Sequence, residues 1–130
     1  MHANNVERWH ELLNSRDVTR LDDLIADDAV FHSPIVHTPQ KGKELTQLYL
    51  TAAYHVLLDS NFRYVREVVS GDDAVFEFTA DIDGIHVNGV DIITCDDDGL
   101  ITEFKVMMRP LQAINAVHAQ MKAMLEKLSS

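Results

Sequence analysis

The chain has little cysteine, proline, glycine and positive charge. Its 130 residues include one cysteine, three prolines and five glycines, and 21 Asp and Glu outnumber 11 Lys and Arg, for a formal charge of −10. The single Cys95 excludes an intramolecular disulfide and a thiolate zinc site, and we expect it to be a small buried hydrophobe within a strand. Nucleic acid and anionic membranes are bound through clustered Lys and Arg, and the sequence has no such cluster. We therefore expect neither as a partner.

Leader sequences and long apolar runs are also missing. No charged and then apolar segment opens the chain, and no apolar run approaches the length that spans a bilayer. The sequence thus predicts a cytoplasmic protein. Hydrophobic residues make up 46% and charged residues 25%, so residues 1–130 fit one domain with a core of its own. No repeat, linker or low-complexity segment indicates a second domain.

The first half of the chain is predicted to be mainly helical. Apolar residues recur at helical spacing in three stretches, which are residues 6–13, 18–25 and 45–56. Asp17 has the side chain expected of an N-cap for the second stretch. Between the second and third stretches, Ala29 to Ser33 is predicted to be a strand that Pro34 ends, because proline has no amide hydrogen for the ladder. Ile35 to Lys41 is predicted to be a loop.

From Phe62 onward the apolar period changes to two, which is typical of strands. The four predicted strands are Phe62–Ser70, Ala74–Asp83, His86–Cys95 and Leu100–Arg109. Acidic and glycine-containing turns separate them, and Asp-Gly pairs supply the positive φ angles of tight antiparallel hairpins. A last helix is predicted from Leu111 to about Leu128. Helices followed by an antiparallel meander indicate an α+β domain. A curved sheet with helices on its concave side leaves a cavity in which small molecules bind.

A resemblance to a known family lies in the stretch from Arg8 to Leu45. It reads Arg-Trp-His-Glu-Leu-Leu-Asn-Ser-Arg-Asp, then Ala-Asp-Asp-Ala-Val-Phe-His-Ser-Pro, then Lys-Gly-Lys-Glu-Leu. This order resembles the opening of the nuclear transport factor 2-like superfamily, which includes SnoaL-like polyketide cyclases and ketosteroid isomerases. The likeness to the isomerases runs from Arg8 to Tyr49 and again from Gly89 to Met108, about half of the chain. It implies a cone-shaped, curved antiparallel sheet wrapped around the N-terminal helices and one pocket, with a C-terminal helix.

The resemblance also points to three positions that carry the chemistry of the isomerases. The position of their helical tyrosine is Trp9, that of their general base is Ser33, and that of their protonated oxyanion-hole acid is Asp91. Only Asp91 keeps the residue type. A serine hydroxyl is too weakly basic to take a carbon-bound proton without a partner, so steroid isomerisation by the familial route is not expected. The second aspartate of limonene epoxide hydrolase relatives falls within Val106–Met108, so that machinery is also missing.

Histidines suggest other chemistries. His37, in the loop beside the expected cavity mouth, is a candidate base at neutral pH, and the alternative is a surface histidine. A relay of His32, Ser33 and Asp91 is disfavoured, because neighbours on a strand point to opposite faces and no nucleophile-elbow motif surrounds the serine. His32 and His37 lack the spacing of known ligand sets. We predict no metal and no cofactor.

The expected site is an apolar cavity around Asp91. Its predicted ligand-binding residues are Trp9, Phe31, Ser33, Tyr49, Phe78, Phe104, Val106 and Met108. An aspartate in an apolar row needs a partner, a ligand or a proton of its own, so Asp91 is either a structural acid or a catalytic hydrogen-bond donor.

Two functions follow from this site. One is isomerase- or cyclase-like acid–base chemistry on a small, largely apolar carbonyl compound. The other is a non-catalytic ligand-binding or assembly domain. Relatives of this fold often pair through the outer sheet face, which here would carry His86, Val90, Ile92 and Met107. We therefore expect a homodimer.

Overall fold

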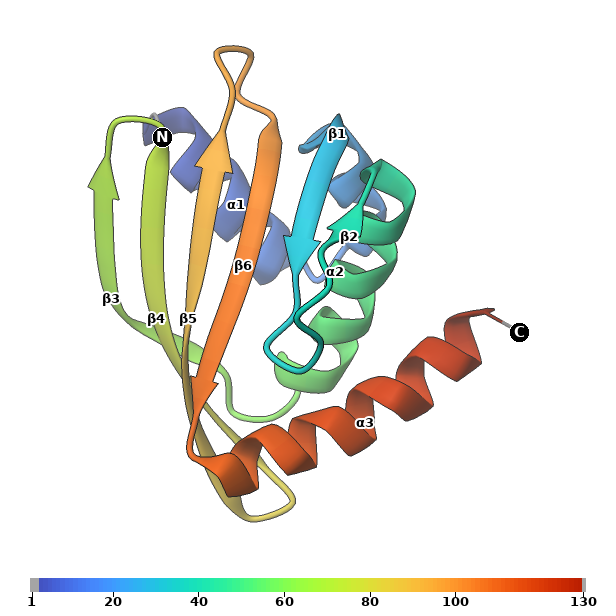
Figure 1. Cartoon of the computed structure of the whole chain (residues 1–130). Helices are drawn as coiled ribbons and strands as arrows, with labels where there is room; N and C mark the ends of the chain where they lie inside the picture. The colour runs from blue at the N-terminus through green and yellow to red at the C-terminus, as the bar shows by residue number, and fades with distance from the viewer. Residues whose placement is uncertain (1–2, 130) are drawn as a thin grey trace.

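A computed structural model describes residues 3–129, and it contains one six-stranded sheet with helices on its concave side (Figure 1). The helical elements are α1 (Ala3–Ser15), the 3₁₀ helix η1 (Val18–Asp23), α2 (Lys43–Leu57) and α3 (Leu111–Ser129). The strands are β1 (Ile25–His32), β2 (Gln40–Lys41), β3 (Arg63–Ser70), β4 (Asp73–Ile82), β5 (Ile85–Cys95) and β6 (Ile101–Arg109). The predicted α+β class, the cone and the C-terminal helix are confirmed.

The sheet has the order β2-β1-β6-β5-β4-β3. Strands β3 to β6 form the predicted antiparallel meander. The Asp83-Gly84 turn between β4 and β5 has φ angles of 52° and 79°, which are the positive values that a type I′ hairpin needs. One expectation was wrong, because β1 runs parallel to β6 and the sheet is mixed. The chain from β2 to β5 serves as the long crossover that a parallel pair requires.

The region before residue 42 also differs in detail from the prediction. The second helical stretch is only a 3₁₀ helix, and Ile25 already belongs to β1. The pairing of β1 with β6 has an irregular register between Ile25 and Val30, so the alternation that would have revealed the start of the strand is lost. The predicted N-cap is confirmed, since the Asp17 carboxylate accepts a hydrogen bond from the Thr19 amide at 3.1 Å. The predicted loop contains β2 at its end.

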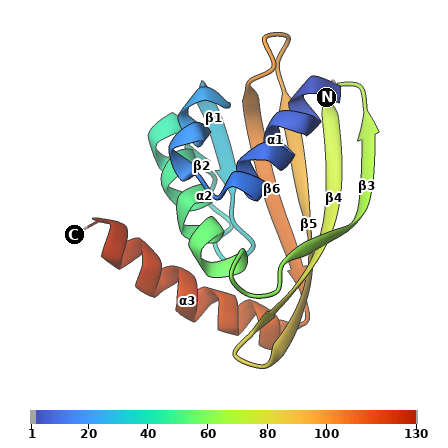
Figure 2. The same ribbon diagram turned by 180° about the vertical axis from the view of Figure 1, so that it is seen from behind.

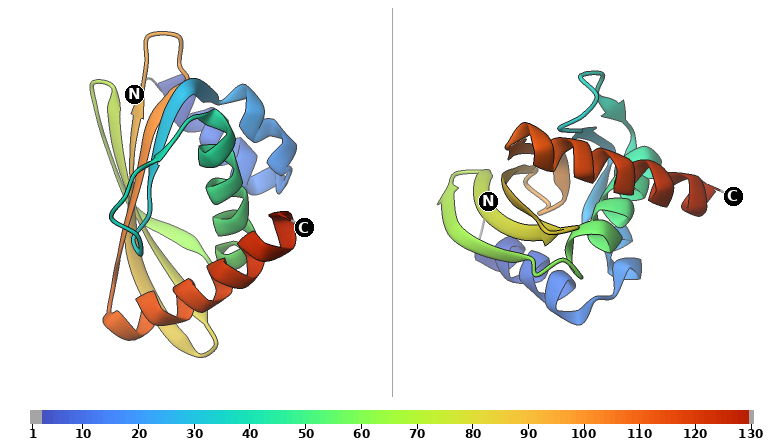
Figure 3. Two further views of the ribbon diagram at one scale, coloured as in Figure 1. Left: turned by 45° about the vertical axis from the view of Figure 1, so that its right-hand side comes forward. Right: turned by 90° about the horizontal axis from the view of Figure 1, so that it is seen from below.

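The helices cover the concave face and one end of the sheet. Figure 2 shows α1 crossing in front of the sheet, with α2 beside it. Helix α3 begins after Pro110 and packs against α2 and the ends of β5 and β6. It therefore lies across the open end of the cone, as both views of Figure 3 show. Helix α3 therefore forms the outer wall of the space between the sheet and α2.

The core fills the narrow part of the cone. Phe76, Phe78, Ala80 and Ile82 are buried on the concave face, as their alternation predicts. Cys95 is buried, and burial raises the pKa of its thiol to about 11, which fits the expected small hydrophobe. None of the helices in the described part of the chain is long and apolar enough to cross a membrane.

Candidate functional site

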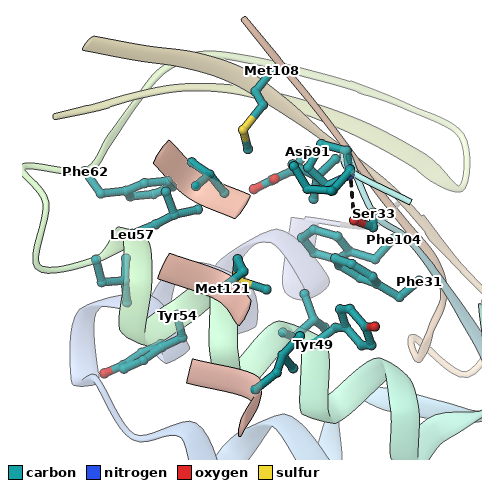
Figure 4. Close-up of a pocket in the computed structure, with 18 of the residues that line it drawn as sticks. Phe31, Ser33, Tyr49, Tyr54, Leu57, Phe62, Asp91, Phe104, Met108 and Met121 are labelled. Carbon is teal, nitrogen blue, oxygen red and sulfur yellow. Dashed lines mark hydrogen bonds between the residues drawn. The ribbon is translucent and has the colours of Figure 1, made fainter. Parts of the chain in front are cut away.

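The wide end of the cone encloses a cavity of about 220 Å³ between the sheet, α1, α2 and α3. Figure 4 shows side chains from the sheet and from the helices converging on this space. Its walls are almost entirely apolar. Helix α2 contributes Tyr49, Leu50, Ala53, Tyr54 and Leu57, and α3 contributes Val117, His118, Met121, Lys122 and Leu125.

Most of the residues that the sequence suggested line this cavity. They are Trp9, Phe31, Ser33, Tyr49, Asp91, Phe104, Val106 and Met108. Three of the aromatic rings contact one another closely: the centroid of Phe31 lies 5.3 Å from Tyr49 and 6.2 Å from Phe104. The Trp9 ring packs 5.3 Å from Phe104, so the four side chains form a continuous wall from α1 to α2.

Two predicted site residues lie elsewhere. Phe78 is fully buried in the core and does not line the cavity. Its ring covers Gly89 on the neighbouring strand, where a Cβ atom would come within 2.5 Å of Phe78 Cζ. His37 is exposed in the loop before β2 and does not line the cavity either. Pro34, Ile35 and Val36 of the loop still line the cavity, whereas His37 does not, so the geometry gives no support to His37 as a base.

Asp91 is the acidic group of the cavity wall. It lies on β5 opposite Val106 of β6, and only 7% of its surface is exposed. The Tyr64 hydroxyl donates a hydrogen bond of 2.6 Å to Asp91 Oδ2, and the Trp9 Nε1–H donates one of 3.0 Å to the Tyr64 oxygen. These three side chains come from β5, β3 and α1. The Trp9 indole therefore supports Tyr64, and its N–H is not free to bind a ligand directly.

Tyr64 is the residue that sequence reasoning missed. Counting back from the turn between β3 and β4, Arg66 pairs with Glu77, so Tyr64 would face Thr79 on the outer surface. A bulge between Tyr64 and Arg66 shifts the register by one residue and pairs Tyr64 with Phe78 instead. Such a shift moves a side chain to the opposite face of a sheet. No local sequence signal marks this bulge.

The electrostatics of the pair follow from burial. Burial raises the pKa of Asp91 to about 7, and the hydrogen bond from Tyr64 opposes this rise. Burial, and then the neighbouring Asp91 carboxyl, hold the pKa of Tyr64 well above its ordinary range, so Tyr64 remains a donor. Because Oδ2 already accepts a hydrogen bond from the Tyr64 hydroxyl, the proton of a neutral Asp91 belongs on Oδ1. The carboxyl can therefore donate a hydrogen bond from Oδ1 when neutral and accept a proton there when ionised.

Ser33 has a structural role directly after the end of β1. Its Oγ accepts hydrogen bonds from the amides of Ile35 at 3.0 Å and Val36 at 3.4 Å, which fixes the turn that leaves β1. The neighbouring His32 lies on the other face of the strand, where its Nε2 is 2.9 Å from Glu103 Oε1. A relay of histidine, serine and Asp91 is thus not assembled. No group of three or more His, Cys, Asp and Glu side chains within residues 3–129 is arranged to hold a metal ion.

The geometry can be compared with known proteins at this point. The SnoaL-like domain family matches residues 6–104, and the chain belongs to this family. It is similar to the crystal structure of a steroid delta-isomerase from Pseudomonas aeruginosa, with 33% identity and a TM-score of 0.90 over 100% of this chain and 98% of that chain. An uncharacterized bacterial protein with a cystatin-like fold from Silicibacter pomeroyi is 31% identical, with a TM-score of 0.85 over 95% of this chain and 85% of that one.

More distant structures show the fold alone. An NTF2-like protein of unknown function from Mesorhizobium loti is 21% identical, with a TM-score of 0.72 over 83% of this chain and 90% of that chain. A comparison with curated proteins gave no significant match. The resemblance seen in the sequence to nuclear transport factor 2-like isomerases and cyclases is confirmed.

Proposed function

We propose that the protein binds a small, largely apolar carbonyl compound in the cavity and acts on it by acid–base chemistry through Asp91. The observation that carries this proposal is the buried Asp91 carboxyl, which faces an apolar cavity with Oδ2 satisfied by Tyr64. A neutral carboxyl in such surroundings donates a strong hydrogen bond to a ligand carbonyl, because little water competes for it. The cavity is smaller than the range of roughly 300–1,000 Å³ typical of ligand pockets, which favours a small ligand.

The chemistry differs from that of the ketosteroid isomerases that the chain resembles. Their base position carries Ser33, whose Oγ is already an acceptor for two backbone amides. Asp91 is therefore the group we propose for both roles, one after the other. The ionised carboxylate takes a proton from the carbon beside the carbonyl and becomes neutral, and the neutral carboxyl then donates a hydrogen bond to the enolate oxygen. A proton from this carboxyl, or from solvent that exchanges with it, returns to carbon and leaves Asp91 ionised again. A pKa of about 7 suits this role, because both protonation states are populated near neutral pH. Reactions of this class include the isomerisation of enones and aldol-type ring closure.

A hydrogen-exchange assay tests the proposal without the natural substrate. The protein is incubated in D₂O with cyclic and aryl ketones, and NMR follows deuterium incorporation at the carbon beside the carbonyl. We expect exchange above background with wild type and none with Asp91→Asn, which keeps the shape and a donor. Asp91→Asn should still bind the ketone with modest loss. Asp91→Leu should weaken binding by about 1–3 kcal/mol, because a buried donor is lost.

A matched control is Asp81→Asn, which changes an exposed acid on β4 outside the cavity. It should leave both exchange and binding unchanged. Ketone binding that needs Asp91 but brings no exchange would favour the non-catalytic binding domain. Ketone binding that Asp91→Leu leaves intact would refute the proposed site.

We also propose that two copies pair through the outer sheet face. Val90 of β5 lies opposite Met107 of β6, and Val68 lies opposite Val75, which pairs with Ile92. Met107 is 51% exposed and Val68 54% exposed, which is costly for a lone surface. The outer sheet face also carries both acidic and basic side chains. A twofold arrangement can therefore place an acidic side chain of one copy beside a basic side chain of the other.

Light scattering tests this association at roughly tens of micromolar protein, where a standard interface should hold. Met107→Glu should give a monomer. The control Leu111→Glu alters a residue that is 71% exposed at the start of α3, away from the sheet face, and should remain dimeric. A monomeric wild type would count against the interface.

A further inference from the structure

The mouth of the cavity is marked by residues that line it and are still exposed to solvent. Val36, in the loop after β1, is 44% exposed, and His118 and Lys122 on α3 are exposed as well. His118 and Lys122 are four residues apart, so they lie on the same face of the helix about one turn from each other. The same face carries Val117, Met121 and Leu125, which close the cavity from the side of α3.

The two basic side chains at the mouth have no acidic partner. No ion pair or hydrogen bond joins the side chain of His118 or Lys122 to any other residue within the described range 3–129. Glu126 lies one further turn along α3 and forms no ion pair with Lys122. Other cations of this acidic chain are paired with carboxylates, so Lys122 and His118 are among the basic side chains that remain available to an anion. Such pairs include Arg16 with Asp59, Lys43 with Asp22, and Arg66 with Glu77.

Apart from His118 and Lys122, no basic side chain among the described residues lines the cavity. Its walls are aromatic and aliphatic, and its acidic group, Asp91, would repel negative charge once ionised. An anionic group of a ligand would also lose its hydration in the interior without compensation. A negative charge on a ligand can therefore be held only at the mouth, in contact with water and with Lys122.

We propose that the ligand is an amphipathic oxo acid, whose carbonyl meets Asp91 inside the cavity and whose carboxylate meets Lys122 and His118 at the mouth. This inference rests on the proposed function and adds the class of ligand and its orientation. The two contacts come from different walls of the cavity, β5 and α3, and differ in exposure, since Asp91 is buried whereas His118 and Lys122 are exposed. A charged end held at the mouth fixes how deeply the carbonyl enters and prevents the ligand from binding in reverse. Lys122 and His118 are thus specificity-determining residues.

A pair of matched probes separates charge from shape. The probes are 5-oxo-5-phenylpentanoate and its methyl ester, which share the aryl ketone and differ in the negative charge. Trp9 is the only tryptophan of the sequence and lines the cavity, so quenching of its fluorescence reports occupancy. Wild type should bind the acid about two- to fivefold more tightly than the ester, the range expected of solvent-exposed ion pairs. High salt should reduce this preference, because it screens the exposed charges.

Two variants test whether the preference for the acid over the ester arises at Lys122. Lys122→Glu should reverse it, so that the ester binds more tightly than the acid. Lys41→Glu makes the same change in charge at an exposed residue outside the cavity, and should keep the preference of wild type. Circular dichroism should show both variants folded, since both positions are exposed.

The outcomes also separate this inference from the proposed function. If wild type binds acid and ester equally, or if Lys122→Glu retains the preference, the assignment of an anionic ligand is wrong. Loss of ester binding in Asp91→Leu would then still support the proposed function. If neither probe quenches Trp9 at millimolar concentration, the carbonyl site and the anionic mouth both fail.

Discussion

Replacing Asp91 with asparagine should change how the stability of the protein depends on pH. Burial raises the folded-state pKa of Asp91 from its ordinary value of 3.8 to about 7. Well below pH 3.8 the carboxyl is neutral in both the folded and the unfolded chain. The contribution of Asp91 to the free energy of unfolding is then at its most favourable. Between the two values the unfolded chain loses the proton first, so the free energy of unfolding falls as pH rises. Above the folded pKa both states are ionised and the loss is complete.

The expected magnitude follows from the difference between the two pKa values. That difference is about three units, and one unit corresponds to about 1.4 kcal/mol, so the loss is about 4 kcal/mol. Asp91 is only 7% exposed, so solvent screens this effect little. Asparagine has a similar shape and no titration. The free energy of unfolding of wild type, taken relative to that of Asp91→Asn, should therefore fall by about 4 kcal/mol between pH 4 and pH 8.

Urea unfolding followed by circular dichroism at a series of pH values measures this difference. Taking wild type relative to the variant removes the contribution of the other acids of the chain, which both proteins share. Asp81→Asn is a control of opposite sign, because a hydrogen bond with His86 lowers the pKa of Asp81, and its contribution is lost as pH falls. A difference for Asp91→Asn that is constant with pH would refute the argument. It would mean that the buried carboxyl is ionised and fully compensated in the fold.

Three further changes test the packing around the site. Tyr64→Phe removes the hydrogen bond that lowers the pKa of Asp91, so NMR titration should find this pKa above about 7, and a lower value would contradict the assigned pair. Gly89→Ala introduces a Cβ 2.5 Å from Phe78 Cζ, and denaturation should show a loss of about 1–3 kcal/mol; unchanged stability would contradict this close contact. Deleting residues 111–130 uncovers the cavity and should cause unfolding or aggregation by light scattering, whereas an equally stable truncation would show α3 to be an appendage.

The longer elements of the fold were predictable from the sequence because each has a local physical signature, whereas β2 and the start of β1 have none. The alternation of β4 and the Asp83-Gly84 turn determine the pairing of β4 with β5, and this register brings Gly89 opposite Phe78. The same alternation puts Asp91 on the concave face, opposite Val106. The direction of β1 had no such signature, because its parallel partner is distant in the sequence. Local patterns specify strands and hairpins, whereas long-range pairing depends on the whole chain.

The errors at the site have a single kind of cause. Phe78 lies on the expected face of the sheet, but Phe62, whose ring centroid is 5.1 Å away, lines the cavity and Phe78 itself does not. Tyr64 was assigned to no site because a one-residue bulge decides which face it occupies. His37 was predicted from a loop expected beside the cavity mouth; Pro34, Ile35 and Val36 of that loop line the cavity, but the exposed His37 does not. Each depends on geometry that periodicity does not encode.

The residues at the site differ in type from those at the same positions of the isomerases, and this difference limits the chemistry that the site can support. The position of the helical tyrosine in the isomerases is Trp9, yet a tyrosine hydroxyl still reaches Asp91, from β3 instead of α1. A contact between a tyrosine and the aspartate is thus present, with Tyr64 donating to Asp91, while the base position has become Ser33. Among the described residues that line the cavity, Asp91 is the acid whose protonation changes near neutral pH, since burial holds Tyr64 in its protonated form. Under the proposed function, a proton that Asp91 takes from a ligand returns from the same carboxyl. The proposal therefore favours reactions that move a proton across one face of a small enolisable compound over those that need a separate buried acid and base.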